Sequence, residues 1–374
     1  MLAQAFAQMG MNSAFIGTIG LGPIGAIAPA SHTTPDPISL QRTLADFVTQ
    51  QVTQVCMEVS SHALHQSRVA GIEFYCVLYT NLTQDHLDYH LSMDDYGASK
   101  ARLFKDFRSQ LAIINVDDEF GEVLATQANS EFVVTYGHQS EDLSVDEVEL
   151  TTAGMRLALA GRGVEFDISS PLVGEVNVPN LMLLCATLLA LSTPIEQIKS
   201  VCSQLQAAPG RMELYQVTDH PSMVVDYAHT PDALAKALQS LRRHCDGQLW
   251  CVFGCGGDRD TGKRAKMGEL ASQYADRIVV TNDNPRSEDP QAIADDILAG
   301  VSLPPAQIQV ELDRKQAIMS VTEQAQPNDW VLVAGKGHEN TQTIGEQKLA
   351  FSDRELLSAW AKSRAQSPAQ DAES

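Results

Sequence analysis

The chain has 374 residues, 44% of them hydrophobic, which is enough to bury a core and more than one ordinary domain needs. Its 47 acidic and 26 basic side chains give a formal net charge of -21, which excludes a broad binding surface for nucleic acid or anionic lipid. Seven cysteines without paired spacing are typical of a reducing compartment, so we expect a cytoplasmic protein.

Residues 1–30 are apolar but contain no Lys or Arg, and glycines interrupt them, which argues against a signal peptide. No later segment reaches the roughly 18 uninterrupted apolar residues of a membrane span, so we expect no membrane insertion. In the first half, β-rich runs alternate with helix-like stretches and predict an α/β sheet. These runs are residues 55–59, 74–82, 111–116 and 132–136.

Residues 145–179 then show short alternating strands with glycine turns, and residues 180–191 predict a helix. A second α/β series follows, with strands at 223–225, 249–253, 277–281 and 330–333 and helices at 231–244, 263–274 and 291–298. Pro209 and Gly210 separate the two series, so we predict domains at 1–207 and 208–374. Asp353 is a predicted N-cap for a last helix, and a polar tail begins at about Ser367.

Two glycine motifs resemble nucleotide-binding loops but do not meet the sequence requirements of such loops. Residues 20–25 fit G-x-G-x-x-G, yet a proline and a polar stretch replace the expected helix, which favours a surface turn. Residues 257–263 match the first seven positions of a P-loop, but Arg264 stands where a Ser or Thr should hold magnesium. Two aspartates in that loop would also repel phosphate, and no other segment resembles a Walker A loop.

Polar residues follow two neighbouring strands of the first half. Glu58 ends the apolar run at 55–57, where a carboxylate could ligate a metal or cap the next helix. Residues 81–90 follow the next strand and bring carboxylates and imidazoles to the same sheet edge, a set that suits Mg²⁺ or is simply solvated. Lys100, fourteen positions after His86, is a charge partner, a modified lysine or an exposed helix residue.

Taken with the second half, these residues resemble the Mur ligase family, and the resemblance covers nearly the whole chain. Eight motifs fall in family order, at residues 58–62, 81–90, 100, 177–180, 210–213, 226–232, 254–259 and 283–286. The resemblance implies a central ATPase-type domain followed by a Rossmann-like α/β domain. It also implies an ATP-dependent ligase of peptidoglycan precursor synthesis, which adds meso-diaminopimelate to UDP-MurNAc-L-Ala-D-Glu through an acyl phosphate.

Phosphoryl transfer to a carboxylate requires cations, which in so acidic a chain must be metal ions and a few placed Lys and Arg. The resemblance implies that Glu58 and His86 ligate Mg²⁺ and that Lys100 is carbamylated. It places Asn180, Arg211 and Asp226 at the nucleotide. We expect a monomer. For the UDP-muramoyl dipeptide the resemblance implies Thr33, Thr34, Ser60, Gln66 and Arg68, whose groups suit carboxylates and amides.

The amine donor has the most specific implied pocket. Arg286 offers a planar fork for a carboxylate, and diaminopimelate has a second carboxylate that lysine lacks, so Arg286 favours diaminopimelate. Glu339 suits the distal ammonium. The full implied set is Arg259, Asp283, Asn284, Pro285, Arg286, Gly335 and Glu339.

The sequence departs from the family at its beginning. The uridine-binding domain, the first strand of the central domain and the P-loop have no counterpart, so we expect the 374 residues alone not to turn over ATP. Three readings stay open: a fragment or misplaced start of a normal ligase, a degenerate homologue that only binds precursor or amino acid, and a folylpolyglutamate synthase-type ligase. An in-frame Gly-Thr-x-Gly-Lys-Thr run upstream would establish truncation.

Overall fold

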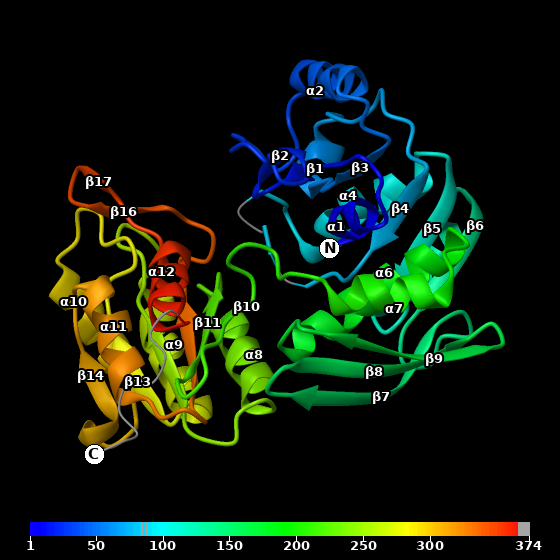
Figure 1. The fold of residues 1–374 in the computed structure, drawn as a ribbon. Coiled ribbons are helices and arrows are strands. Elements are labelled where there is room, and N and C mark those ends of the chain that lie inside the picture. Colours follow the sequence, from blue (N-terminus) through cyan, green and yellow to red (C-terminus); the bar gives the residue numbers. More distant parts are fainter. Residues whose placement is uncertain (84, 87–88, 366–374) are drawn as a thin grey trace. The chain divides into compact units, whose positions relative to one another are not determined.

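The computed structural model describes residues 1–83, 85–86 and 89–365. The chain forms two compact units (Figure 1). Unit 1 comprises Met1–Glu149, Met155–Pro171 and Asn177–Leu205, and unit 2 comprises Leu150–Gly154, Leu172–Val176 and the remainder from Gln206. Asp88 of the 81–90 motif and the predicted tail from Ser367 lie outside the described residues. In the described ranges no helix has the length and apolar character needed to cross a bilayer.

Unit 1 contains small sheets rather than one continuous sheet. The first has the order β2-β1-β3, in which β2 (Gly20–Pro23) is antiparallel and β3 (Gln54–Met57) parallel to β1 (Ser13–Gly17). The second is wholly parallel, in the order β4 (Cys76–Tyr79), β5 (Ser109–Asn115), β6 (Ser130–Tyr136). A third has the order β7 (Ser144–Thr151), β8 (Gly154–Gly161), β9 (Val164–Ser170).

Several helices of unit 1 begin at side-chain caps. Asp36, Ser92 and Asp118 accept backbone N–H groups at the starts of α2 (Pro37–Thr49), α4 (Met93–Lys105) and α5 (Glu119–Gln127). The others are α1 (Leu2–Gln8), α3 (Ser61–His65), α6 (Val178–Ala190) and α7 (Ile195–Ser203). Two hydrophobic clusters result, one between the first sheet and α2, the other between the second sheet and α4.

Unit 2 is built on one six-stranded sheet in the order β10-β11-β15-β12-β13-β14, parallel except for β10. Its strands are β10 (Glu213–Tyr215), β11 (Ser222–Asp226), β12 (Leu249–Phe253), β13 (Arg277–Val280), β14 (Ile308–Val310) and β15 (Trp330–Ala334). Its helices are α8 (Pro231–Arg242), α9 (Gly262–Tyr274), α10 (Pro290–Leu298), α11 (Arg314–Gln324) and α12 (Asp353–Ala365). Separate hydrophobic clusters cover the two sheet faces, as expected for parallel strands buried on both sides.

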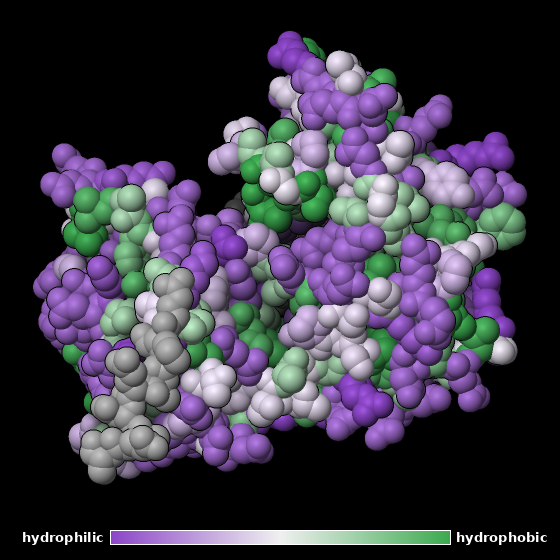
Figure 2. Space-filling model, viewed as in Figure 1, coloured by the Kyte–Doolittle hydropathy of each residue, from purple (hydrophilic) through white to green (hydrophobic). Residues whose placement is uncertain are grey.

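The predicted α/β fold class is confirmed, and the predicted strands and helices are present within a few residues. Residues 20–25 form an edge of the β1–β2 hairpin, with no helix after them. Arg264, which replaces the P-loop Ser or Thr, is buried in ion pairs with Glu288 and Asp296. Neither motif therefore has the features of a nucleotide-binding loop. Figure 2 shows hydrophilic residues spread over the visible face, in keeping with the high charge of the chain.

The prediction that Asp353 caps the last helix is wrong. The N–H of Glu355 donates to the Ser352 hydroxyl. Asp353 instead forms a fully buried ion pair with Arg314, at 2.7 Å and 2.8 Å. If Asp353 capped the helix, Arg314 would be buried without a counter-ion. The ion pair with Arg314 is therefore the more stable arrangement.

Candidate functional site

A chain of hydrogen bonds in unit 1 joins the five residues predicted to contact the precursor. The Thr34 hydroxyl donates to the Glu58 carbonyl (2.8 Å) and accepts from the Ser60 N–H (3.1 Å). Arg68 donates to the Thr34 carbonyl (2.9 Å) and to the Gln66 side chain (2.6 and 2.8 Å). The Thr33 hydroxyl lies 3.0 Å from that of Thr18. Residues from three separate segments thus meet at the carboxyl end of β3.

The Glu58 carboxylate is fixed at that same end. Its Oε2 accepts from the N–H of Thr18 (2.9 Å) and from the Thr18 hydroxyl (2.7 Å). Gly17 lies against it so closely that a Cβ there would stand 2.6 Å from Glu58 Cδ. Ser60, whose hydroxyl accepts from the N–H of Ala63, caps α3. The alternative reading of Glu58 as a helix cap is therefore wrong, and its carboxylate stays on the strand end.

Lys100 and His86 both approach the ring of Tyr96. Lys100 Nζ lies 5.1 Å from the ring centre and donates to the Asn81 carbonyl at 2.9 Å, while the His86 ring lies 5.8 Å away. Burial lowers the pKa of Lys100, partly offset by the charges of Asp118 and Asp85. Lys100 is thus held over the loop that follows β4. Because its pKa is lowered, the neutral amine is more populated than in an exposed lysine.

The sequence predicted imidazoles at this sheet edge, but not the tyrosines that pack with them. Tyr89 lies 4.0 Å from the His62 ring and within hydrogen-bond distance of His65 and Gln66. His90, nearly fully buried, is stacked on Tyr96 and lies 2.9 Å from the Ser61 hydroxyl. In the sequence, only the motif at 81–90 indicated this packing, because its aromatic residues are spaced to contact α3 and α4. The cluster connects the precursor residues to Lys100 and His86.

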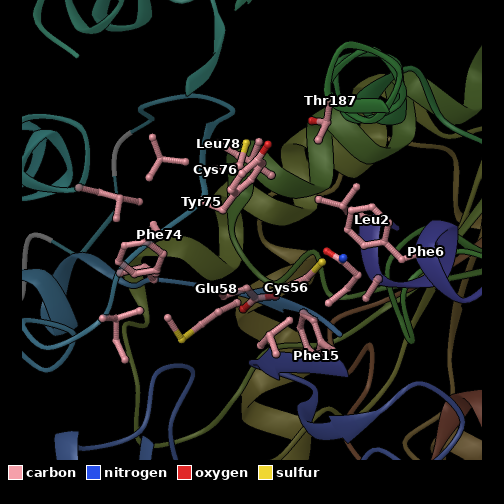
Figure 3. Close-up of a pocket in the computed structure, with 18 of the residues that line it drawn as sticks. Leu2, Phe6, Phe15, Cys56, Glu58, Phe74, Tyr75, Cys76, Leu78 and Thr187 are labelled. Carbon is pink, nitrogen blue, oxygen red and sulfur yellow. The ribbon is translucent and has the colours of Figure 1, made fainter. Parts of the chain in front are cut away.

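The side chains of unit 1 do not by themselves form a complete set of metal ligands. Glu58 and Lys100 line one cavity (Figure 3), but within the described part of the chain no three His, Cys, Asp or Glu residues lie close enough to hold a metal. A carbamylated Lys100 would supply a further oxygen group of the kind Mg²⁺ prefers. The residues therefore fit Mg²⁺ only if Lys100 carries this modification or the substrates contribute ligands.

Asn180, predicted at the nucleotide, lies in the first turn of α6 in unit 1. Its Nδ2 donates to the Asn177 Oδ1 at 3.3 Å. The side chain is half-buried, and α6 packs against β5 and β6. It is therefore held at a helix N-terminus, where the macrodipole favours anionic ligands.

In unit 2, Arg211 and Asp226 come together at the end of β11. Asp226 accepts from the N–H groups of Met212 (2.8 Å) and Ala228 (2.9 Å), and the Arg211 guanidinium lies 4.7 Å from the ring centre of Tyr227. Burial raises the pKa of Asp226, although these N–H bonds and the charge of Arg211 oppose the shift. The exposed Arg211 is thus presented beside a carboxylate fixed by the backbone.

The predicted donor residues converge where β13 and β15 end. Asn284 donates to Asp283 Oδ1 (2.9 Å) and to Glu339 Oε2 (3.0 Å), and Lys336 donates to the same Glu339 oxygen (3.0 Å). Burial would raise the pKa of Glu339, but the charge and hydrogen bond of Lys336 and the bond from Asn284 outweigh it, so the pKa lies below its usual value. Burial raises the pKa of Asp283, against the charges of Arg314 and Lys336. Glu339 is thus kept ionised.

Arg286 is anchored between two neighbouring loops. Its side-chain Nη1 donates to the Gly257 carbonyl (2.6 Å), and its backbone N–H donates to the Thr343 carbonyl (3.1 Å). Its φ of 53° is unusual for a residue with a side chain. A guanidinium has five N–H donors, so this anchor leaves a fork for a carboxylate. Arg259 lies exposed on the loop after β12, and Pro285 approaches Gly257 through its carbonyl.

A buried ion pair below this pocket was also missed. Arg314 Nη2 donates to Asp353 (2.7 Å) and to the Ala334 carbonyl (2.9 Å), and its Nη1 donates to the Asn282 carbonyl (3.2 Å). Ala334 ends β15 and Asn282 follows β13, so one guanidinium ties both strand ends from which Asp283 and Gly335 project. No local sequence signal marks Arg314, because an arginine in the first turn of a helix is ordinarily exposed.

Comparisons with known proteins identify the family of the chain. The profile of the Mur ligase middle domain matches residues 1–188, and that of the Mur ligase glutamate ligase domain matches residues 210–337. A Chromobacterium violaceum protein named UDP-N-acetylmuramoyl-L-alanyl-D-glutamate--2,6-diaminopimelate ligase is 47% identical over 369 residues, covering 96% of this chain and 74% of that protein. The protein of the same name from Vibrio parahaemolyticus is 44% identical over 95% of this chain and 72% of its own length.

Solved structures show the same likeness. A structure with the same printed enzyme name aligns with a TM-score of 0.75 and 35% identity over 98% of this chain and 76% of its own. A folylpolyglutamate synthase of Mycobacterium tuberculosis aligns with a TM-score of 0.67 over 89% of this chain and 84% of its own, but at 18% identity, which shows a shared fold alone.

Proposed function

Since the chain belongs to the Mur ligase family of ATP-dependent ligases, we propose that it joins meso-diaminopimelate to UDP-MurNAc-L-Ala-D-Glu in peptidoglycan precursor synthesis. The observation that carries the proposal is that Arg286, Asn284 and an ionised Glu339 lie on neighbouring loops at the carboxyl ends of the unit 2 strands. A guanidinium fork and a carboxylate are the groups that recognise the distal amino-acid head of diaminopimelate. The relatives named for this reaction support it.

Residues of both units suit the other substrates. In unit 1, Thr33 and Arg68 are polar groups for the peptide of the precursor, while the buried Thr34 holds the Glu58–Ser60 segment in place. The nucleotide is assigned to Asn180 of unit 1 and to Arg211 and Asp226 of unit 2. Bound Mg²⁺, held by Glu58, His86 and a carbamylated Lys100, would neutralise the phosphoryl oxygens and the substrate carboxylate. Lys100, oriented by the Asn81 carbonyl, is a candidate for that modification because burial favours its neutral amine.

Donor preference tests the proposal without requiring turnover. Binding of meso-diaminopimelate and L-lysine to the full chain is measured by ligand-detected NMR, for the unchanged protein and for Arg286→Asn. We expect diaminopimelate to bind more tightly than lysine, and Arg286→Asn to weaken diaminopimelate by about tenfold or more with little effect on lysine, because a charge-assisted pair is lost. Equal losses for the two amino acids would contradict the pocket.

Arg156→Asn is the matched control, because Arg156 is an exposed arginine of unit 1 that pairs with Glu149. It should leave both affinities unchanged. Mass spectrometry of UDP-MurNAc-dipeptide incubated with ATP, Mg²⁺ and diaminopimelate then reports whether the chain forms product. Binding without product would favour the reading of a homologue that only binds its ligands.

A further inference from the structure

Lys336, in the loop after β15, is a fully buried lysine whose ammonium is completely used by the protein. Its Nζ donates to the Thr341 carbonyl (2.7 Å), to Glu339 Oε2 (3.0 Å) and to Asn284 Oδ1 (3.4 Å). An ammonium carries three hydrogens, so none is left to donate to a ligand. Any effect of Lys336 on a ligand must therefore pass through the groups to which it donates.

Glu339 is the acceptor of Lys336 that reaches the surface. Its side chain is 33% exposed, whereas that of Lys336 is 0% exposed. The backbone N–H of Glu339 donates to the Lys336 carbonyl (2.9 Å), so one turn holds both residues. Asn284 Nδ2 donates to Glu339 Oε2 as well, at 3.0 Å. In the described part of the chain both side-chain donors reach Oε2, which leaves Oε1 for a cationic ligand.

Lys336 also fixes the orientation of the Asn284 amide. The amide oxygen accepts from Lys336 and from the N–H of Thr343 (2.9 Å), while the amide nitrogen donates to Asp283 Oδ1 (2.9 Å) and to Glu339. A reversed amide would place its NH₂ group against two donors and its oxygen against two carboxylates. The amide therefore has one favourable orientation, with its nitrogen toward both carboxylates.

Lys336 is a counter-charge for both carboxylates. Burial raises the pKa of Asp283, and the charges of Arg314 and Lys336 oppose this shift. At Glu339 the effect of burial is outweighed by Lys336 and Asn284, so the pKa lies below its usual value. Further charged or titratable groups that act on the two carboxylates are His338, Tyr227 and Asp353. Arg314 is already paired with Asp353, whereas Lys336 is bonded directly to Glu339.

We propose that Lys336 is a positioning residue that selects an amine donor with a distal ammonium group, because it holds the Glu339 carboxylate and the Asn284 amide in place. This inference rests on the proposed function. Lys336 does not touch the donor. An ammonium gains a charge-assisted hydrogen bond with Glu339 Oε1, whereas a donor with only a carboxylate at this end meets a negative oxygen without a counter-charge. Lys336 thus acts on selectivity through Glu339.

Two ligands that differ only in the distal ammonium test this role. Binding of meso-diaminopimelate and of α-aminopimelate, which keeps both carboxylates but lacks the distal amine, is measured by ligand-detected NMR with the full chain. We expect Lys336→Met to weaken diaminopimelate by about tenfold or more and to change α-aminopimelate by less than about twofold. Equal weakening of both ligands would overturn the proposal, because that is the effect of a loosened structure.

Lys199→Met is the matched control. Lys199 donates to Glu196, three positions away, at 2.9 Å, but this pair is exposed on α7. The substitution removes the same kind of lysine from the same kind of pair in a different environment. It should leave both affinities unchanged.

A cycle with Glu339→Gln shows whether Lys336 acts through Glu339. The double variant Lys336→Met with Glu339→Gln removes both charges of the pair, so it can fold even where Lys336→Met alone cannot. Glu339→Gln should itself lower the preference for diaminopimelate over α-aminopimelate, and the added Lys336→Met should not lower it further. A further drop of about tenfold would mean that Lys336 acts independently of Glu339, which would overturn the proposal.

A readout without ligand separates this inference from the proposed function. The titration of Glu339 is followed by NMR of glutamate isotope-labelled at the side-chain carboxyl carbon, and its signal is identified by its loss in Glu339→Gln. We expect the midpoint to rise by about one pH unit or more in Lys336→Met, because loss of a nearby cation favours the neutral acid. An unchanged midpoint would overturn the inference. A shifted midpoint in a protein that does not bind diaminopimelate would instead contradict the proposed function.

Discussion

Glu58 is held in place by residues that belong to no motif. Its sequence context allowed a metal ligand or a helix cap, and the choice was decided by Thr18, forty positions away, and by the absence of a side chain at Gly17. Lys336 is a similar case: its fully buried ammonium donates to Glu339 and to the Thr341 carbonyl. A sequence gives no sign that a particular lysine is buried, because the counter-charges come from distant loops. The roles assigned to individual site residues remain predictions.

The ionisation of Glu339 predicts a pH dependence. Its folded pKa lies below the unfolded value of about 4.3, so its contribution to stability is complete above that value and is lost as pH falls through the folded pKa. Thermal unfolding of the protein and of Glu339→Gln should therefore differ near neutral pH and converge under acid conditions. A difference that persists unchanged at acid pH would show that Glu339 stabilises the pocket by packing rather than charge.

At the scale of elements, the strands of unit 2 were predictable because they are continuous apolar runs with turn residues between them. β12 and β15 are buried at every position, the pattern expected of central parallel strands. The short edge strands β10 and β14 and the hairpin of β16 (Thr341–Ile344) and β17 (Gln347–Ala350) were not predicted, since β17 is exposed throughout and has no periodic burial. In unit 1 the apolar run at 55–57 predicted β3.

The Arg314–Asp353 pair connects α11, α12, β13 and β15, so its loss should be felt across unit 2. Asp353→Ala leaves the buried guanidinium without a counter-ion and should lower the free energy of unfolding by about 3–5 kcal/mol in chemical denaturation. The double variant Arg314→Met with Asp353→Leu should recover much of this loss. If the double variant is no more stable than Asp353→Ala, the charge imbalance is not the cause.

The same double variant should also affect the residues predicted to bind the amine donor. Because Arg314 ties Asn282 and Ala334, Arg314→Met with Asp353→Leu should weaken diaminopimelate binding even where stability is restored. Ligand-detected NMR on the refolded double variant measures this. Unchanged affinity would show that the loops hold their places without the tie.

For the whole molecule, the formal charge of -21 implies self-repulsion that salt should relieve. The Debye length falls from about 10 Å at 0.1 M to about 3 Å at 1 M ionic strength, so the unfolding temperature should rise with NaCl over this range. Differential scanning calorimetry at fixed pH measures it. A falling unfolding temperature would mean that attractive ion pairs, rather than net charge, dominate the electrostatics.

The turn that carries Arg211 and the loop that carries Glu339 touch backbone to backbone. A Cβ at Gly210 would lie 2.1 Å from the carbonyl carbon of Gly337, and both glycines have positive φ. With no side chain between them, neither segment can shift without displacing the other. Displacement of one segment by a bound ligand should therefore be transmitted to the other.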